Sequence, residues 1–461
     1  MAFIHIVLGI TAFPRELQNL SLKYFCLQVV VSGIYLSFAW ISLYYLSVLD
    51  SFSVFGFIVA IGMLCGAILD IPLGILTDRF GQKKAFCSAL FCLTVYYFGL
   101  IYASNPLDLV FLEVLVGVYS ALLSGSFISW FMNSWESLTP KKSDNGLMFR
   151  NVMGNISFAK TIFATLATLT GGVLLQQGYL FPQTIFLLQA FIAFLGIFLG
   201  IKFMDIPRSM KKDTVHQKKV NYSPYLLFSS SKNHSRIISL LINLKEEYSG
   251  VFLYFISFSI LSFTSTSFSY LVFSPMLYEI GSSNQTFNQN DIIVQYTTTS
   301  LIFITLSYSL SEFIFAISSR LSAKMTSLVK SPYRGILAFY IFGYPVIWLF
   351  YVCIMIIPIP LYEKLILFIL IYFVKIILNG LSIGLFWQLY YRITSSKSRS
   401  SQESLFNTIK LVISLIGYGI MGTILETSSF MGGLLFLFIS SCIAIFVMVI
   451  AKNCERIFCY E

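Results

Sequence analysis

The sequence predicts an all-α integral membrane protein with 12 transmembrane helices, arranged as two six-helix halves. Of its 461 residues, 57% are hydrophobic and only 11% are charged, and the mean hydropathy is +0.82. Soluble domains carry about 25% charged residues. Twelve apolar runs are long enough to cross a bilayer, which takes about 20 residues. A long basic and polar interruption separates six of these runs from the other six.

The apolar runs define the predicted elements in chain order. The first half comprises residues 1–201 and the second half residues 250–461, and the basic segment 202–249 between them is predicted to be a cytoplasmic linker. The predicted spans are 24–48, 52–75, 85–104, 109–132, 152–175, 181–201, 250–273, 293–317, 335–357, 365–389, 404–425 and 430–451.

The positions of Lys and Arg predict the orientation. With both termini in the cytoplasm, 26 of the 30 basic residues fall in cytoplasmic loops and tails, as expected for a multi-pass protein of the cell membrane. The formal net charge of +10 is thereby explained without a nucleic-acid partner. The eight cysteines contain no C-x-x-C pair, so we expect neither a disulfide framework nor a metal site, and no cofactor.

The loop between the second and third spans carries a recognisable motif. It runs Asp-Ile-Pro-Leu-Gly-Ile-Leu-Thr-Asp-Arg-Phe-Gly-Gln-Lys-Lys over residues 70–84. The matching positions are Gly74, Leu76, Asp78, Arg79, Gly81, Lys83 and Lys84. They resemble the G-x-L-x-D-R-x-G-x-K-K loop of the major facilitator superfamily, from which Gln82 departs. Glycine at positions 74 and 81 would allow close packing and a tight turn.

The resemblance implies a fold of two six-helix bundles related as parallel repeats. It also implies that Asp78 and Arg79 help to hold the cytoplasmic side closed, with Asp78 facing the start of the eleventh helix. The sequence supports the repeat independently. Asp70 precedes Arg79 by nine residues, and Glu312 precedes Arg320 by eight at the corresponding eighth span. Such duplication is typical of the two halves of these carriers.

Six ionisable residues lie within the predicted spans: Asp70, Glu113, Lys160, Glu312, Lys375 and Lys410. A charge within the bilayer costs roughly 2.5–3.5 kcal/mol on insertion scales, so it usually faces a cavity or a partner. Lys160 and Lys375 fall near the middle of their spans. For these two we keep three interpretations: contact with substrate, internal ion pairing, and reaching to the lipid edge.

Polar residues at helical spacing accompany these charges. Gln28 and Tyr35 belong to a stripe on the first span, Ser124 to one that begins at Glu113, and Asn379 to one that begins at Lys375. These residues are candidates to line a substrate cavity, although a serine or threonine can instead bond to its own helix backbone. The candidates for proton coupling are Glu113, Glu312 and Asp70, because all three histidines lie outside the spans.

The sequence therefore favours a secondary active transporter of a small organic solute, working by alternating access and coupled to protons. An enzyme is not expected, since no catalytic constellation lies at membrane depth. A non-transporting receptor on the same fold is the alternative. The chain resembles prokaryotic members of the superfamily, either multidrug-efflux-like or uncharacterised, but the segment Thr170–Val173 lacks the glycine-proline signature of exporters.

Free lysines at mid-depth would favour an anionic substrate, because an anion relieves two like charges. Paired lysines would leave a neutral cavity, which suits a lipophilic, drug-like or zwitterionic compound. From their predicted depths, Asp70 and Glu312 are expected toward the cytoplasmic ends of their helices and Glu113 toward the outside. Direct pairing of a lysine with Glu113 or Glu312 is therefore expected to be awkward along one helix, but it stays open between neighbouring helices if the fourth and fifth helices pack together.

Overall fold

The computed structural model of the chain is almost entirely helical, and the part that it describes contains no strand. It describes residues 5, 8–11, 13–139, 145–176, 181–204, 249–281, 299–328, 332–393 and 399–453. Most of the predicted linker, residues 205–248, lies outside this set.

The helices of the first half follow one another through short turns. They are α2 (Arg15–Val31), η1 (Ser32–Leu36), α3 (Ile41–Leu49), α4 (Phe52–Phe80), α5 (Gln82–Leu100), α6 (Pro106–Leu138), α7 (Asn145–Gln176) and α8 (Pro182–Phe203). Their ends follow local chemistry. The Ser51 hydroxyl caps α4 by accepting from the Val54 amide at 3.2 Å, and Asn105 forms a capping box with Asp108 before Pro106 opens α6.

The second half repeats the pattern. Its helices are α12 (Ser249–Ser267), η2 (Phe268–Phe273), α13 (Ser274–Gly281), α15 (Thr299–Leu328), α16 (Pro332–Gly343), α17 (Pro345–Ile356), α18 (Leu361–Ile393) and α19 (Arg399–Asn453). The segment η2 is a π-helix. Helix α16 ends where Tyr344 leaves helical geometry before Pro345 (φ −133, ψ −79), because proline disfavours a helical residue before it.

These elements make the 12 predicted crossings. Ten segments of the described chain are long and apolar enough to span a bilayer. The last of these, Phe406–Ala451, holds two crossings, since Ser429 (φ 63, ψ −176) interrupts the 55-residue α19. At 1.5 Å per residue, α19 would otherwise measure about 80 Å, far more than the roughly 30 Å of hydrocarbon. The remaining crossing is α5, a 19-residue helix whose start is basic.

The first crossing is not one continuous helix, contrary to the predicted run 24–48. It begins earlier, at Arg15, and residues 37–40 separate η1 from α3. Other helices satisfy the backbone groups freed by this break, as a membrane protein requires. The Gln189 amide of α8 donates to the carbonyls of Gly33 (3.3 Å) and Ile34 (2.7 Å), and the Thr168 hydroxyl of α7 donates to Tyr35 (3.1 Å).

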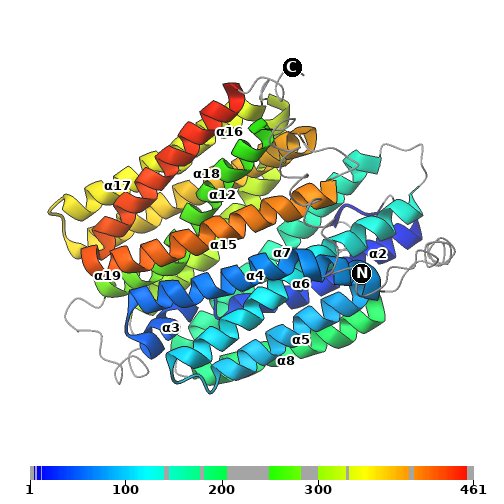
Figure 1. Cartoon of the computed structure of the whole chain (residues 1–461), viewed down its shortest axis with the longest axis horizontal. Coiled ribbons are helices and arrows are strands. Elements are labelled where there is room, and N and C mark those ends of the chain that lie inside the picture. The colour runs from blue at the N-terminus through cyan, green and yellow to red at the C-terminus, as the bar shows by residue number, and fades with distance from the viewer. Residues whose placement is uncertain are drawn as a thin grey trace, which may run out of the picture.

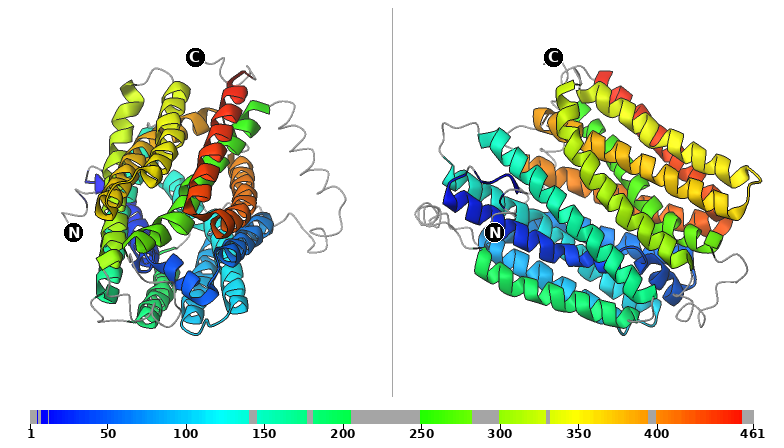
Figure 2. Two further views of the ribbon diagram at one scale, coloured as in Figure 1. Left: turned by 90° about the vertical axis from the view of Figure 1, so that its left-hand side faces the viewer. Right: turned by 180° about the vertical axis from the view of Figure 1, so that it is seen from behind.

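The two halves form neighbouring bundles that meet along two helix pairs (Figures 1 and 2). Helix α4 packs along α19, and α7 packs along α15. In the order of crossings, the second meets the eleventh and the fifth meets the eighth. The two pairs are equivalent, because the second crossing of one half corresponds to the eighth in the other, and the fifth corresponds to the eleventh. We call these two contacts the seam.

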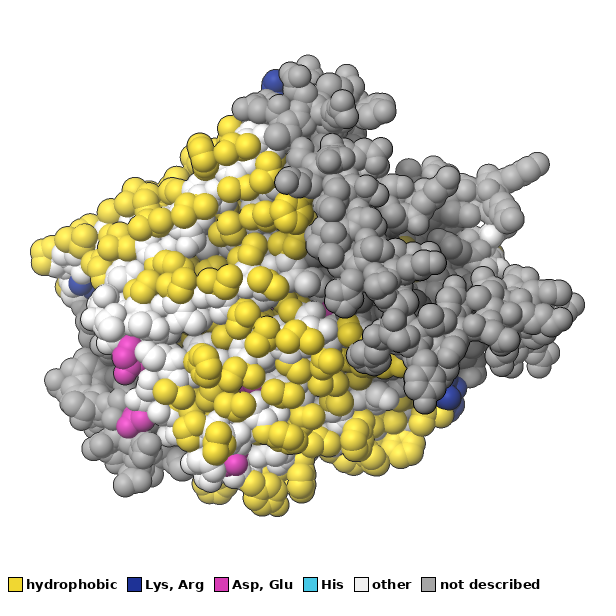
Figure 3. All heavy atoms as spheres, viewed as in Figure 1, with side chains coloured by type: hydrophobic (Ala, Val, Ile, Leu, Met, Phe, Trp, Pro, Cys, Tyr) yellow, Lys and Arg dark blue, Asp and Glu magenta, His cyan; other side chains and the backbone are white. Residues whose placement is uncertain are grey.

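Apolar side chains dominate the outer surface (Figure 3). Large exposed residues lie on most of the long helices, including Phe111, Phe198 and Phe446. In a membrane protein such residues face lipid rather than water. Acidic side chains gather at one end of the face in Figure 3. We call the helix ends that carry Asp50 and Glu426 the outer end, and the ends that carry Gly81 the inner end, following the predicted orientation.

At the outer end a carboxylate joins the two halves. Glu426 of α19 accepts from the backbone amides of Phe52 (2.8 Å) and Ser53 (3.3 Å) and from the hydroxyl of Ser51 (3.2 Å), at the start of α4. A carboxylate at a helix N-terminus also meets the positive end of the helix dipole. We call this contact the outer latch.

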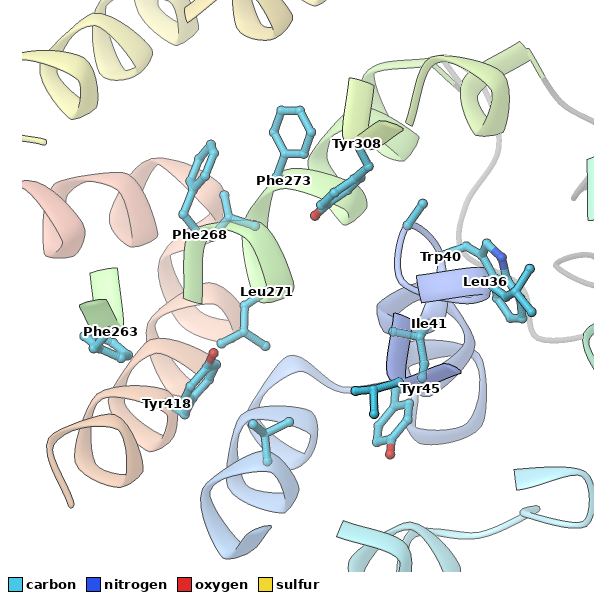
Figure 4. Packing of buried hydrophobic residues seen from close by; sticks show 14 of the residues in the cluster. Leu36, Trp40, Ile41, Tyr45, Phe263, Phe268, Leu271, Phe273, Tyr308 and Tyr418 are labelled. Atoms are coloured by element: carbon cyan, nitrogen blue, oxygen red, sulfur yellow. The ribbon is translucent and has the colours of Figure 1, made fainter. Parts of the chain in front are cut away.

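Glycines let the same two helices approach closely. A β-carbon at Gly56 would lie 2.5 Å from the carbonyl oxygen of Tyr418, and one at Gly422 would lie 2.6 Å from that of Phe52. Aromatic packing continues inward from this point. Figure 4 shows Leu271 of η2 pointing toward Tyr418 of α19, and just after η2 the Ser274 hydroxyl donates to the Ala39 carbonyl of the broken first crossing at 3.1 Å. The outer ends of the halves are therefore closed against each other.

Candidate functional site

Buried charges lie on the helices at or next to the seam. Lys375, Asp70 and Glu113 are 0%, 5% and 6% exposed, and Lys160 and Glu312 are half-buried. Because burying a charge is costly unless it is compensated, the surroundings of each group show what it can do.

Lys160 and Glu312 face each other across the seam, the first on α7 and the second on α15. Their charges interact electrostatically, but no ion pair within 4.0 Å joins them. Lys160 is the sixteenth of 32 residues in α7, and Glu312 the fourteenth of 30 in α15. Both therefore lie near mid-depth.

This position corrects the depth expected for Glu312. The apolar run 293–317 suggested a location toward the inner end and awkward pairing with a mid-depth lysine. The helix actually starts at Thr299 and continues through Arg320 to Leu328. Its polar last turns add length that hydrophobicity alone does not reveal. Glu312 is thus central and opposes a lysine of the other half.

The register of α7 and α15 sets the spacing of the two charges. Gly172 packs against Thr305, and the Arg320 guanidinium lies 5.0 Å from the ring centre of Phe158. The helices are therefore antiparallel, with Lys160 level with about residue 317. Glu312 is then about five residues further along, an axial offset of about 7.5 Å.

Three tyrosines lie within electrostatic range of the Glu312 carboxylate. Its charge interacts with Tyr35 of the first half and with Tyr308 and Tyr372 of the second. The Tyr308 hydroxyl donates to the Ser269 carbonyl of η2, and the Tyr372 hydroxyl lies 3.4 Å from the Ser269 hydroxyl. Both rings are thereby fixed beside Glu312. Tyr35, predicted to line the cavity, is in the same group.

Lys375 has a different environment. Its ammonium lies 5.1 Å from the ring centres of Phe268 and Trp348 and 5.6 Å from that of Tyr372, and it donates to the Ser265 carbonyl at 3.3 Å. Such rings stabilise a cation through their negative faces. We call this arrangement the lysine cage. It holds Lys375 entirely inside the second half.

Asn379 lies one turn beyond Lys375 on α18 and belongs to the same network. Its amide donates to the Ser265 hydroxyl at 3.4 Å, and the Tyr344 hydroxyl bonds with both Ser265 and Asn379. Gln28, in contrast, donates to the Tyr24 hydroxyl within its own helix at 2.8 Å. The structure therefore groups Asn379 with Lys375 and places Gln28 in a local contact on α2.

Glu113 and Asp70 occupy two further polar clusters. Glu113 of α6 accepts from the Tyr45 hydroxyl at 2.7 Å, and Tyr45 lies 3.1 Å from the Tyr96 hydroxyl. Asp70 of α4 accepts from the Ser124 hydroxyl of α6 at 2.8 Å. The predicted cavity residue Ser124 is thus a hydrogen-bond donor to a buried carboxylate. Within the described residues, no group of His, Cys, Asp and Glu could hold a metal ion.

Comparison with known proteins decides the family. The family model described as Major Facilitator Superfamily matches residues 24–418, most of the chain. The chain belongs to the major facilitator superfamily. Members are carriers rather than enzymes, and they bind small solutes within a membrane, so the protein is a multi-pass membrane transporter of this superfamily.

Solved structures of other superfamily members show the same fold. The nucleoside transporter NupG (D323A mutant) is 13% identical with a TM-score of 0.65, over 94% of this chain and 99% of that one. The D-xylose-proton symporter is 14% identical with a TM-score of 0.61, over 95% and 97%. At such identities the likeness concerns the fold alone. Among curated proteins, no sequence matches this chain.

The motif loop of the superfamily lies at the inner end of α4. Gly81 makes the expected tight turn, with φ +92, and Lys83 and Lys84 begin α5. Gly74 does not pack closely, since a β-carbon there would meet no described atom within 4 Å. Asp78 and Arg79 lie in the last turns of α4, but their side chains lie outside the described set, so the gate role stays a prediction.

Sequence reasoning missed most of the aromatic partners. Tyr308 precedes Glu312 by four residues and Tyr372 precedes Lys375 by three, so helical spacing could have identified both. Trp348 and Phe268 reach the lysine cage from other helices, and no local pattern signals them. Glu426 falls between the predicted spans 404–425 and 430–451, and nothing in the sequence around it signals that it joins the halves.

Proposed function

We propose that this superfamily member carries a small organic solute across the cell membrane by alternating access, with its solute site at the seam. The opposed charges of Lys160 and Glu312 carry this proposal. They lie at mid-depth, one on each half, where rocking of the two bundles would expose them to either side in turn. Repeat-based carriers place their substrate sites near this depth.

Coupling to protons forms the second part of the proposal. Glu312 is the first candidate carrier of the proton, because it lies at the seam, and Glu113 and Asp70 follow. The structurally similar D-xylose-proton symporter supports proton coupling on this fold. The cytoplasmic location of both termini and the relation to prokaryotic multidrug exporters stay proposals. The seam offers no feature that favours export over import.

The test is solute counterflow in proteoliposomes. Unlabelled metabolites would be sorted by charge into classes, and vesicles would be loaded with one class at a time. Exchange would be followed with a trace of a labelled member of the same class outside the vesicles. We expect protein-dependent accumulation of at least one class, and its loss in the double variant Lys160→Met, Glu312→Gln. A non-transporting receptor would bind a compound, as seen by a rise in melting temperature, without exchanging it.

A further inference from the structure

We infer that the seam site takes a zwitterionic solute, with the anionic group of the solute at Lys160 and its cationic group at Glu312. This inference rests on the proposed transport function and names the substrate class of the same site. It follows from the charges, the spacing and the neighbours of these two residues.

Lys160 and Glu312 carry opposite charges at the seam. In the part of the chain that the structure describes, neither Lys160 nor Glu312 makes a hydrogen bond or an ion pair, and each charged end keeps some accessible surface. Their axial offset is about 7.5 Å. The geometry thus holds opposite charges apart, with each one free to receive a partner.

The classes of solute differ in how they compensate these two charges. In a closed, dry site, a monoanion at Lys160 would leave the charge of Glu312 uncompensated. A monocation at Glu312 would likewise leave the charge of Lys160 uncompensated. A neutral solute would leave both uncompensated. An unpaired buried charge is strongly unfavourable. While Glu312 is ionised, only a solute with both charges satisfies both residues in the sealed site.

The second mid-depth lysine is Lys375. A site for an anion between Lys160 and Lys375 would need both ammonium groups to face the solute. Lys375 is 0% exposed, and three aromatic rings and the Ser265 carbonyl already surround it. The lysine cage therefore removes one of the two partners on which an anion site depends.

Tyr308 and Tyr372 are held beside Glu312, and Tyr35 approaches from the other half. Because the hydroxyls of Tyr308 and Tyr372 bond to Ser269, they are occupied. The ring of Tyr372 is also engaged by Phe273 and Lys375. Because neither hydroxyl donates to Glu312, its carboxylate favours the cationic end of the solute here.

The test uses two sets of compounds of similar size that differ in which charged groups they carry. One set is β-alanine, propionate, propylamine and propionamide. The other is phenylalanine, 3-phenylpropionate, phenethylamine and 3-phenylpropionamide. Each competes for counterflow of the labelled zwitterion of its set, and each is also tested alone for stabilisation of the purified protein. We expect the zwitterion to compete at least about tenfold better than its matched partners.

Two variants and two controls assign the charges. Lys160→Met should lower the advantage of the zwitterion over the matched amine by about tenfold in competition. Glu312→Gln should lower its advantage over the matched acid by about the same factor. The intramembrane Lys410→Met and the variant Glu363→Gln, in the first turn of α18, should leave the order of the compounds unchanged. A merely structural ion pair would lower stability in both site variants without changing that order.

The outcomes separate this inference from the proposed function. Counterflow or stabilisation by an acid, an amine or an amide, with zwitterions weaker, would overturn the zwitterion class while transport stands. An unchanged order of compounds in Lys160→Met and Glu312→Gln would do the same. Absence of counterflow for every class, including the metabolite mixture, would contradict the transport function itself.

Discussion

At the scale of single residues, the two mid-depth lysines are not equivalent. Lys160 is half-buried and faces a carboxylate of the other half, whereas Lys375 is caged by aromatic rings inside its own half. The difference comes from neighbours that are remote in sequence. Trp348 lies on α17 and Phe268 on η2, and both converge on α18 only in the fold.

The residue-scale prediction concerns proton coupling. Glu312→Gln and Glu113→Gln each remove a buried ionisable carboxyl while keeping its shape. If Glu312 carries the proton at the seam, Glu312→Gln should lose most pH-gradient-driven flux but retain counterflow of the solute, which needs no net proton movement. Glu113→Gln should reduce driven flux less, because Glu113 is bonded to Tyr45 within the first half.

The measurement is uptake into proteoliposomes with and without an imposed pH gradient, at equal protein content. Glu363→Gln, in an exposed position, serves as the matched control. Full gradient-driven flux in both Glu312→Gln and Glu113→Gln would rule out these two carboxylates as the coupling groups.

At the scale of elements, the outer latch and the motif loop lie at opposite ends of α4. The outer latch joins the start of α4 to α19 through Glu426. The motif loop follows the inner end of the same helix, where Gly81 turns the chain into α5. Helix α4 therefore connects two places where the halves can hold each other.

Loss of the outer latch should favour opening of the outer end. Glu426→Ala removes three hydrogen bonds and a favourable helix-dipole contact, together worth about 1–2 kcal/mol, or roughly a 5- to 30-fold shift in the equilibrium between closed and open outer ends. Spin labels would replace the exposed Leu107 and Ile357. Double electron-electron resonance between them should show a larger population of long distances in Glu426→Ala.

The nearby Thr427→Ala is the matched control, since the Thr427 hydroxyl bonds to the Thr423 carbonyl of its own helix at 2.9 Å. Its distance distribution should equal that of the unmodified protein. An unchanged distribution in Glu426→Ala would show that the outer latch does not contribute to closure.

The motif loop gives the converse prediction. If Asp78 faces the positively polarised N-terminus of the eleventh helix, Asp78→Asn should weaken closure of the inner end and favour the inward-open state. We expect turnover to fall several-fold while solute affinity changes little. Counterflow rate and equilibrium binding at matched expression would separate the two effects, and unchanged transport would exclude a gate role for Asp78.

At the scale of the whole molecule, the sequence predicted the architecture well and the site only in part. Hydrophobic length, basic loops and the motif from Gly74 to Lys84 were enough for the fold, because spanning a bilayer imposes simple rules on length and charge. The depth of Glu312 was wrong, since α15 continues beyond its apolar run. The lysine cage and the outer latch depend on contacts between distant helices, which a single sequence does not show.

If transport proceeds by alternating access, the two halves must separate at the outer end. A reversible crosslink can test this directly, because the Ser51 hydroxyl lies 3.2 Å from the Glu426 carboxylate, so cysteines at these two positions are within reach of a short bifunctional methanethiosulfonate. The variant Ser51→Cys, Glu426→Cys would be made in a background whose native cysteines are replaced by serine. Mass spectrometry would verify the bridge before each assay.

The decisive measurement is counterflow by this double-cysteine protein in crosslinked and reduced forms of one preparation. We predict that the crosslinked protein does not exchange solute, and that adding a reductant restores exchange to the level of the same double-cysteine protein that was never crosslinked. Equal exchange by the bridged and the reduced protein would contradict the account, because the solute would then cross while α4 and α19 stay joined.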